Sequence, residues 1–261
     1  MISIKDYVKE RKNLLAEKIS KSEKKPMLVI IQVGDNPASN SYVKGKLKDC
    51  EEVGLKANLE KLPEEISQEE FERKIKKIND DKEVTGIIIQ LPLPRHLSVN
   101  LDLIDDKKDV DGFKITSKFV PCTPLGIINF LKNNNIEMSG KNAVVIGRSE
   151  IVGKPMANLL LNENATVTVC HSKTKNISEH TKMADIIVVA TGKRNILTKD
   201  MIGNNRPIVI DVGINRNEEG KLCGDCDYEN IVDLCEYVSP VPGGVGLLTR
   251  LTLIENVLAT I

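Results

Sequence analysis

Short apolar or β-branched runs alternate along this chain with segments of helical character, and this alternation limits the possible folds more than any other feature. A strand that is apolar at nearly every position is buried on both faces, which is typical of parallel sheets covered by helices. The pattern therefore predicts an α/β protein with parallel sheets. The runs are Met27–Val33, Gly86–Leu91, Ala143–Gly147, Thr166–Cys170, Asp185–Ala190 and Ile208–Val212.

Length and charge narrow the class of protein further. The 261 residues suffice for two modest domains. Lys+Arg and Asp+Glu both number 37, which argues against a nucleic-acid or membrane partner held by bulk charge. No apolar run approaches the roughly 20 residues of a membrane span. The first twenty residues mix acids and bases, unlike a signal or transit peptide, so we expect a cytoplasmic protein.

The segment from Ala143 onward has the pattern of a dinucleotide-binding domain. A buried run ends at Gly147, and a glycine turn with Ser149 and Gly153 leads into a helix. Small residues let the backbone approach a pyrophosphate, and the helix N-terminus supplies oriented N–H groups. The spacing differs from G-x-G-x-x-G, so the strand–turn–helix context carries the prediction. The Pro121–Pro124 stretch (PCTP) places the domain boundary near residue 120.

The residues after the next strand indicate which dinucleotide binds. An NAD-selective fold usually places an acid about 20 residues after the glycine turn. Here the strand ends in Cys170-His171-Ser172-Lys173, without an acid. Arg148, Ser172 and Lys173 suit a 2′-phosphate, so we predict NADP.

Lys46 is the most unusual residue of the N-terminal third. The segment Ser39–Gly54 predicts a helix, and at about 100° per residue Lys46 falls on its apolar side, one turn after Tyr42. Burial favours the neutral form of a lysine, which makes Lys46 a candidate proton acceptor. The alternative is a lysine whose stem packs while its ammonium reaches solvent.

Gln90 is the one amide in the apolar run Gly86–Leu91, and it lies at the carboxyl end of that run. Ligands of open α/β sheets bind beyond the carboxyl ends of strands, so Gln90 and Lys46 could meet at one crevice. The alternative is an amide that satisfies loop backbone.

Three further features leave a functional and a structural interpretation open. Asp109 and Asp111 lie in a charged stretch that lacks the ligand pattern of a calcium loop, and a solvated turn is the simpler interpretation. Cys223 and Cys226 form a lone C-x-x-C without a second pair, so we expect no metal site. The proline–glycine loop Ser239–Gly246 could hold an anionic ligand tail or be a plain turn before a helix.

Taken together, these segments resemble the bifunctional methylenetetrahydrofolate dehydrogenase/methenyltetrahydrofolate cyclohydrolase family over nearly the whole chain. The matching motifs follow the family's order: VGDNPASNSYVKGK, GIIIQLPLP, KKDVDGF, PCTPLG, VVIGRSEIVGKPMANLL, VTVCHSKT, ADIIVVATG, IVIDVGINR, SPVPGGVG and TLIEN.

The resemblance implies two lobes. Residues 1–120, completed by a C-terminal helix at 247–261, would form a folate-binding catalytic domain, and residues 121–246 a Rossmann-like NADP-binding domain. It also implies a homodimer formed through the Rossmann domains. The expected activity is oxidation of methylenetetrahydrofolate with NADP, followed by hydrolysis of the methenyl product to 10-formyltetrahydrofolate.

The resemblance also assigns roles to residues. Lys46 corresponds to the catalytic lysine, Tyr42 stacks on the folate, Gln90 positions and tunes the lysine, and Asp111 bonds the pterin. Gly243 and Gly244 would flank the folate. The positions expected to contact the cofactor are Gly147, Arg148, Ser149, Gly153, Ser172 and Ile214.

One departure from the family and three alternatives remain. Leu247-Leu248 replaces the usual proline and the following methionine or leucine, which puts contacts of the preceding loop in doubt. The chain could be a dehydrogenase without cyclohydrolase activity, a non-catalytic nucleotide sensor, or an oxidoreductase for another substrate. The retained Lys46 argues against the first, and Lys46 with Tyr42 argues against the second.

Overall fold

The computed structural model describes residues 2–261 and divides them into two compact units. Lys9–Cys122 and Arg250–Ile261 form one, called the Lys46 unit below. Residues up to Val8 and Thr123–Thr249 form the other, called the Gly147 unit. No helix among the described residues is long and apolar enough to cross a membrane.

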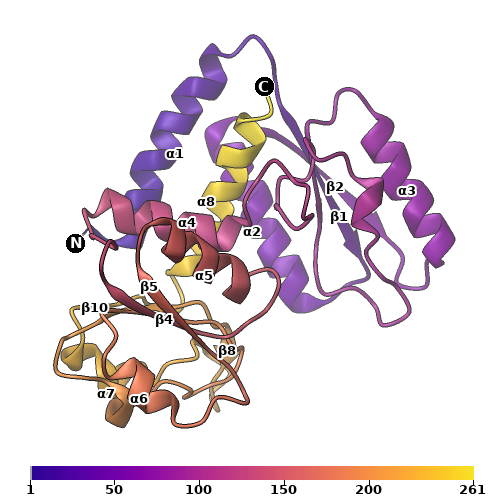
Figure 1. Cartoon of the computed structure of the whole chain (residues 1–261). Coiled ribbons are helices and arrows are strands. Elements are labelled where there is room, and N and C mark those ends of the chain that lie inside the picture. Colours follow the sequence, from indigo (N-terminus) through magenta and orange to yellow (C-terminus); the bar gives the residue numbers. More distant parts are fainter. Residues whose placement is uncertain (1) are drawn as a thin grey trace. The chain divides into compact units, whose positions relative to one another are not determined.

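The Lys46 unit is built on a three-stranded parallel sheet of order β2-β1-β3. Helices lie on both sides of it, with α2 on one side and α3 on the other (Figure 1). The strands are β1 (Met27–Val33), β2 (Lys56–Leu62) and β3 (Gly86–Ile89). The helices are α1 (Ile4–Lys21), α2 (Pro37–Val53), α3 (Gln68–Asp80), the 3-10 turn η1 (Leu101–Leu103) and α8 (Val245–Leu258), of which α1 and α8 begin in the other unit.

Side chains along β1 alternate between the two faces of the sheet, so the core of this unit has one layer on each face. Val29 and Ile31 pack in the same cluster as Phe71 and Ile75 of α3. Side chains at the intervening positions of a strand point to the opposite face, where Gln32 contacts Asn40 of α2. A sheet covered on both faces explains why β1 is apolar at nearly every position.

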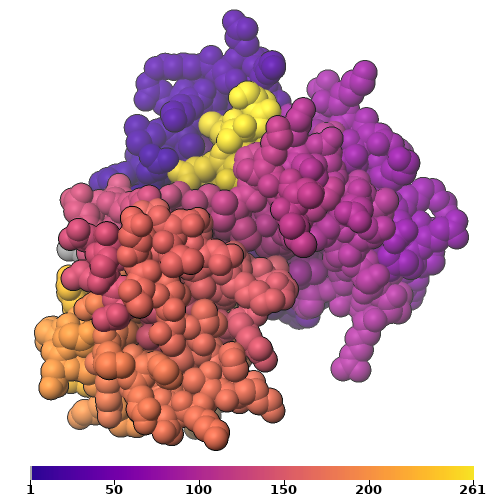
Figure 2. Space-filling model, in the orientation of Figure 1, coloured from indigo at the N-terminus to yellow at the C-terminus, as the bar shows by residue number. Residues whose placement is uncertain are grey.

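The C-terminal residues of α8 are part of the Lys46 unit although they are distant from it in sequence. In Figure 2 these yellow residues lie beside the indigo residues of α1. Arg11 of α1 pairs with Glu255 of α8 at 2.6 Å. Asn256 donates its side-chain N–H to the carbonyl of Val110 at 2.9 Å. The last turns of α8 therefore hold a loop that follows β3.

The Gly147 unit contains a five-stranded parallel sheet of order β10-β7-β6-β4-β5. Its order reverses between β4 and β6, which is the switch point where ligands of such sheets bind. The strands are β4 (Asn142–Ile146), β5 (Thr166–Cys170), β6 (Ile186–Val189), β7 (Ile208–Asp211) and β10 (Tyr237–Val238), with a separate hairpin of β8 (Asn215–Arg216) and β9 (Leu222–Cys223). The helical segments are α4 (Cys122–Asn133), α5 (Gly153–Asn162), α6 (Ile177–Thr181), η2 (Lys199–Met201), α7 (Tyr228–Ile231) and η3 (Val232–Leu234).

The predicted α/β class with parallel sheets is confirmed, and the differences fall at helix starts. The helix predicted from Ser39 begins at Pro37, because Asn36 and not a serine caps it. The C-terminal helix expected at 247–261 begins at Val245, inside the proline–glycine loop.

Candidate active site

Helix α2 presents Lys46 to the interior of its unit. The Asn36 side chain accepts hydrogen bonds from the N–H groups of Ala38 and Ser39 at 3.0 and 3.1 Å, which fixes the first turn. Gly54 ends the helix in the left-handed conformation with φ of 75°. Between these ends, Lys46 is 5% exposed, so the predicted inward orientation is confirmed.

The Lys46 ammonium lies between an amide and an aromatic ring. Its Nζ donates to Gln90 Oε1 at 3.2 Å and lies 5.1 Å from the centre of the Tyr42 ring. Gln90 Nε2 donates to the carbonyl of Leu91 at 2.7 Å, which directs the amide oxygen to the lysine. Gln90 itself lies just beyond the last residue of β3. The expected meeting of Gln90 with Lys46 therefore occurs, and both partners of the ammonium are uncharged.

Asp111 provides the negative charge near this lysine. Burial raises the pKa of its carboxyl, Asp109 raises it further, and the positive charge of Lys46 opposes both. The buried thiol of Cys122 lies close enough for Asp111 to raise its pKa, beyond the larger effect of burial. Lys46, Gln90, Asp111 and the Tyr42 ring thus form one group of side chains in the Lys46 unit.

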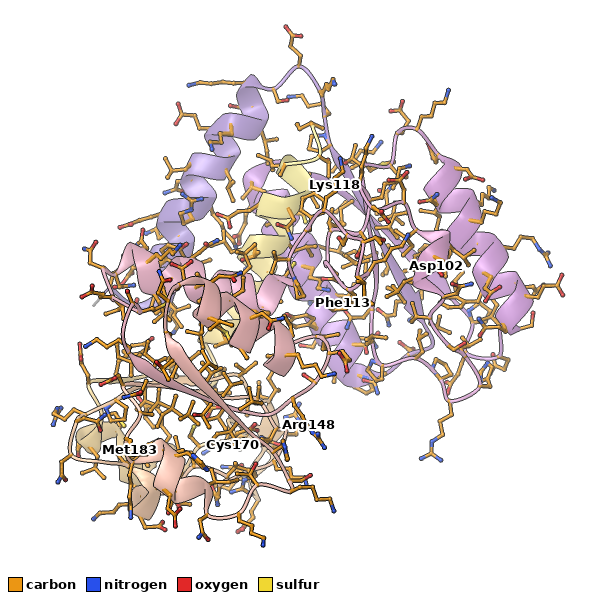
Figure 3. The ribbon with its side chains drawn as sticks, in the orientation of Figure 1. Asp102, Phe113, Lys118, Arg148, Cys170 and Met183 are labelled. Atoms are coloured by element: carbon orange, nitrogen blue, oxygen red, sulfur yellow. The ribbon has the colours of Figure 1, made fainter. Side chains whose placement is uncertain are left out.

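The turn that carries Asp111 is buried, so its interpretation as a solvated turn is wrong. Asp109 is 3% exposed and accepts backbone N–H bonds from Gly112 and Lys114 at 3.2 and 2.8 Å. Asp111 receives no such bond from the described residues. Asp109 therefore shapes the turn, whereas Asp111 accepts a hydrogen bond from the side chain of Cys122. Phe113, in the same turn, is labelled in Figure 3.

A buried charge cluster on α2 was missed by sequence reasoning. Asp49 is 6% exposed and pairs with Lys12 of α1 at 2.5 Å and with Arg250 of α8 at 2.8 Å. A Cβ atom built on Gly45 would lie 1.8 Å from Arg250 Nη1, so the guanidinium lies against the backbone of α2 beside Lys46. These ion pairs tie α2 to α1 and α8.

In the Gly147 unit, the turn after β4 has the close backbone approach that a dinucleotide site requires. Gly147 has φ of +129°, and a Cβ atom there would lie 2.3 Å from the carbonyl oxygen of Ala190. A Cβ atom on Gly153 would lie 2.3 Å from the carbonyl oxygen of Gly147. Only glycine fits at both positions. The turn lies at the switch point of the sheet and opens helix α5, so these residues fit a pyrophosphate.

The other predicted cofactor residues lie at the carboxyl ends of neighbouring strands. Arg148 and Ser172 are exposed beyond β4 and β5, and Ile214 is 62% exposed beyond β7. Figure 3 shows Arg148 near Cys170, the last residue of β5. Ser149 differs from the rest, because its hydroxyl accepts the N–H groups of Val152 and Gly153 at 3.2 and 3.3 Å. In this structure Ser149 therefore caps the start of α5.

Two buried carboxylates that the sequence did not indicate organise this strand edge. Asp225 Oδ2 accepts from the Thr191 N–H, the Thr191 hydroxyl and the Gly192 N–H at 2.6, 2.9 and 2.9 Å. Its Oδ1 accepts from Asn215 Nδ2 at 2.8 Å. Asp211 accepts from the N–H groups of Gly213 and Asp225 at 3.0 and 2.9 Å. Together they fix the two backbone neighbours of Ile214.

Gly243 and Gly244 also belong to the Gly147 unit, in the loop between β10 and α8. The N–H of Leu247 donates to the carbonyl of Gly244 at 2.9 Å. Leu247, which stands where family members usually have proline, is half-buried, and Leu248 is fully buried. Cys223 and Cys226 are free thiols, and burial raises the pKa of Cys226.

These features define the class of protein. One parallel α/β unit carries a buried lysine paired with an amide, and the other has the glycine turn of a dinucleotide-binding domain. The family model "Tetrahydrofolate dehydrogenase/cyclohydrolase, catalytic domain" matches residues 2–111. The model for the "NAD(P)-binding domain" of the same family matches residues 121–261. The chain belongs to the tetrahydrofolate dehydrogenase/cyclohydrolase family.

Relatives of known name agree with this membership. The "Bifunctional protein FolD" of Bacillus cytotoxicus is 51% identical over 242 residues, covering 88% of this chain and 84% of the relative. The crystal structure of the bifunctional FolD from Campylobacter jejuni has a TM-score of 0.90 and 46% identity, covering 98% of this chain and 94% of that one. The Trypanosoma brucei dehydrogenase-cyclohydrolase, solved with NADP cofactor and inhibitor, has a TM-score of 0.91 and 31% identity, covering 100% and 96%.

Proposed function

We propose that this chain is a bifunctional enzyme of one-carbon folate interconversion. It oxidises 5,10-methylenetetrahydrofolate to the methenyl compound with NADP and then hydrolyses that compound to 10-formyltetrahydrofolate. The observation that carries the proposal is the buried Lys46 ammonium held by Gln90 beside Tyr42, within a chain that matches both domains of the family.

The Lys46 group accounts for folate binding and hydrolysis. The Tyr42 ring offers a face on which the flat pterin system stacks, and Asp111 accepts hydrogen bonds from the pterin N–H groups. In the hydrolytic step, water adds to the methenyl carbon and loses a proton, which Lys46 in its neutral form accepts. Gln90 holds Nζ in place for this transfer.

The Gly147 unit supplies the cofactor site in this proposal. The backbone at Gly147 and Gly153 holds the pyrophosphate, Arg148 and Ser172 bind the 2′-phosphate, and Ile214 contacts the cofactor from the end of β7. Ser149 contributes by fixing the turn, because its hydroxyl accepts the N–H groups of Val152 and Gly153 at the start of α5. When bound, NADP accepts the hydride of the one-carbon unit. Gly243 and Gly244 flank the folate.

The domain roles and the setting follow from the same assignment. Residues 1–120 with 247–261 form the folate-binding domain, and residues 121–246 form the NADP-binding domain. The protein acts in the cytoplasm as a homodimer formed through its Rossmann-like domains. Sedimentation at micromolar concentration should give a mass of about two chains, and a monomer under those conditions would rule the dimer out.

The decisive experiment follows NADPH and methenyltetrahydrofolate by absorbance in the same cuvette, for the parent protein and for Lys46→Met. In the parent protein NADPH accumulates while the methenyl band stays weak. Lys46→Met removes the proton acceptor, so we expect hydrolysis to fall by about 10²–10⁴-fold. The affinity for NADP, measured by titration, should stay the same. Undiminished hydrolysis in the variant would refute the role of Lys46.

The same assay separates the alternatives. A dehydrogenase without cyclohydrolase activity accumulates the methenyl compound in the parent protein. A nucleotide sensor or an oxidoreductase for another substrate forms no NADPH from methylenetetrahydrofolate.

A further inference from the structure

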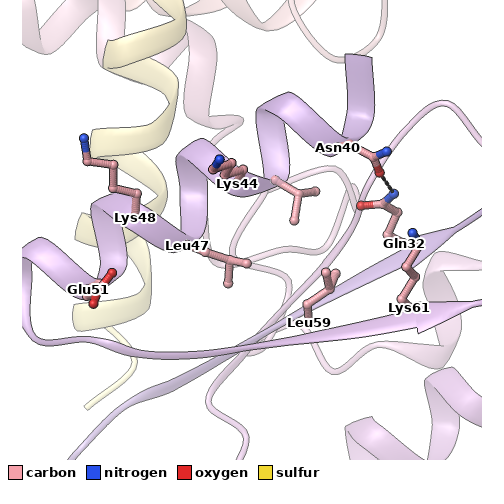
Figure 4. Close-up of a pocket in the computed structure, with 9 residues that line it drawn as sticks. Gln32, Asn40, Lys44, Leu47, Lys48, Glu51, Leu59 and Lys61 are labelled. Carbon is pink, nitrogen blue, oxygen red and sulfur yellow. Dashed lines mark hydrogen bonds between the residues drawn. The ribbon is translucent and has the colours of Figure 1, made fainter. Parts of the chain in front are cut away.

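A groove lies on the outer side of α2, between this helix and the edge strand β2 (Figure 4). Its volume of about 570 Å³ is within the range of small-molecule sites. Val43, Leu47 and Leu59 supply an apolar surface. The polar side chains that line it are Gln32, Asn40, Lys44, Lys48, Glu51 and Lys61. The groove is separate from the Lys46 group, which α2 presents on another face.

Gln32 presents an unpaired oxygen to this groove although its side chain is 2% exposed. Its Nε2 donates to Asn40 Oδ1 at 2.6 Å and to the carbonyl of Gly34 at 3.2 Å. Figure 4 shows the amide oxygen of Gln32 turned away from Asn40, toward the other lining residues. Among the described residues no donor meets this oxygen.

The neighbouring charges fix that orientation of the amide. Asp35 accepts from Asn40 Nδ2 and from Lys61 Nζ, both at 2.7 Å. Those two hydrogen bonds lower the pKa of the Asp35 carboxyl, so it is an ionised acceptor. Asn40 must therefore turn its nitrogen to Asp35 and its oxygen to Gln32. Gln32 must in turn direct its nitrogen to Asn40, which leaves its oxygen for a ligand with an N–H or O–H group.

The lysines around the groove are not equivalent. Lys61 is paired with Asp35, and Lys48 lies 3.8 Å from Glu52. Lys44 has no acidic partner among the described residues, so its charge is available to an anion. Glu51 lines the same groove and disfavours a ligand with several negative charges. A single negative charge fits this balance best.

We propose that this groove binds a small amphipathic monoanion. The ligand gives an N–H or O–H donor to Gln32, packs an apolar ring system on Val43, Leu47 and Leu59, and directs its charge to Lys44. On α2, Val43 directly follows Tyr42, and Leu47 directly follows Lys46. Occupancy of the groove therefore alters the Michaelis constant for the folate. This coupling rests on the proposed function, whereas the binding site does not.

The test uses 2-anilinonaphthalene-6-sulfonate, a fluorescent monoanion with an N–H between its phenyl and naphthalene rings and a sulfonate at the far end of the naphthalene. It is titrated into the full chain with NADP at saturation, which blocks the dinucleotide site. We expect Leu59→Glu to weaken binding at least tenfold and Lys44→Glu about three- to tenfold. Asn58→Glu is the matched control, because it adds the same charge to the other face of β2 and should leave binding unchanged.

The N-methylated form of the probe tests the contact with Gln32. It lacks the donor and should bind at least fivefold more weakly to the parent protein. Equal affinity for both probes, or equal weakening by Leu59→Glu and Asn58→Glu, would overturn the proposed site.

Activity tests the coupling separately. Saturating probe should change the folate Michaelis constant at least twofold in the parent protein but not in Leu59→Glu. No change in the parent would refute the coupling. A chain that binds the probe but does not oxidise methylenetetrahydrofolate would contradict the proposed function and leave the site intact.

Discussion

Asp109 and Asp111 show how neighbouring, chemically identical residues take different roles. Asp109 accepts two backbone N–H groups and stabilises its turn. Asp111 accepts no backbone N–H group, and burial raises its pKa despite the opposing effects of Lys46 and the Cys122 side chain. A buried carboxyl with a raised pKa lowers the stability of the fold and is available to a ligand. Such carboxyls are common at functional sites.

The replacement Asp111→Asn tests this division by its pH dependence. The folded state raises the pKa of Asp111, so it holds the proton more tightly than the unfolded chain does, and ionisation of Asp111 costs stability. The cost is absent below the ordinary aspartate pKa of about 3.9, and it grows as pH rises toward the value in the folded protein. Asp111→Asn should therefore be more stable than the parent at pH 7, with a difference that vanishes near pH 4 in urea titrations.

The same variant should lose at least tenfold in kcat/KM for the folate, since an amide accepts fewer N–H donors than a carboxylate. Asp109→Asn is the control and should be less stable than the parent at pH 7, because it weakens the acceptor of two backbone N–H groups. A neutral-pH loss of stability in Asp111→Asn would contradict the assignment.

At the scale of single residues, the sequence identified candidate site residues where a polar side chain interrupts an apolar pattern. Lys46 on an apolar helix face and Gln90 in an apolar strand were both visible as exceptions. Asp49 was not, because charged neighbours surround it in the sequence and its partners come from α1 and α8. Gln32 also lies in an apolar run, yet its role depends on Asn40 and Asp35, whose arrangement only the structure gives.

At the scale of elements, the Asp49 ion pairs determine how firmly α2 is held in its unit. Removing one partner of a buried ion pair leaves an uncompensated charge, whereas replacing both partners by apolar groups is often nearly neutral. Because Asp49 keeps its ion pair with Lys12, we expect Arg250→Met to cost less than full loss of a buried pair, about 2 kcal/mol of unfolding free energy. The double replacement Asp49→Ala with Arg250→Met should recover about half of that loss. Strictly additive effects in urea titrations would show that the two side chains act independently.

Asp225 plays the corresponding role between β6 and the β8–β9 hairpin. In Asp225→Asn an amide NH₂ group replaces one carboxylate oxygen and faces the donors that this oxygen accepted. Losing these charge-assisted hydrogen bonds costs about 2 kcal/mol of unfolding free energy. Because this carboxylate fixes Asn215 beside Ile214, we expect the dissociation constant for NADPH to rise about tenfold while the KM for the folate is unchanged. Asp233→Asn, which removes an exposed acid of the same unit, is the control. Equal NADPH affinity in parent and Asp225→Asn would contradict the positioning role.

At the scale of the whole molecule, the composition and spacing of the strands predicted that both parts of the chain contain a parallel sheet. Strands buried on both faces are apolar at nearly every position, and this is visible in the local sequence. The boundary near residue 120 was indicated by the Pro121–Pro124 stretch, but closure by a C-terminal helix was expected from the family resemblance alone. The unit around Lys46 closes with residues from Arg250 onward, and the first residues of the chain belong to the other unit. Such closures depend on contacts between distant segments, such as Arg11 with Glu255, that no local pattern contains.

The choice of cofactor can be tested on the whole molecule by its thermal stability. A ligand at 100 times its dissociation constant stabilises the folded state by about 2.7 kcal/mol. Arg148 and Ser172 are exposed at adjacent strand ends, and the residues directly after β5, His171-Ser172-Lys173, include no acid, so we expect NADP to raise the unfolding temperature more than NAD at equal concentration. Arg148→Gln should weaken NADP binding at least tenfold, or about 1.4 kcal/mol, and leave NAD binding unchanged. Equal losses for both cofactors in calorimetry would show that Arg148 does not bind the 2′-phosphate.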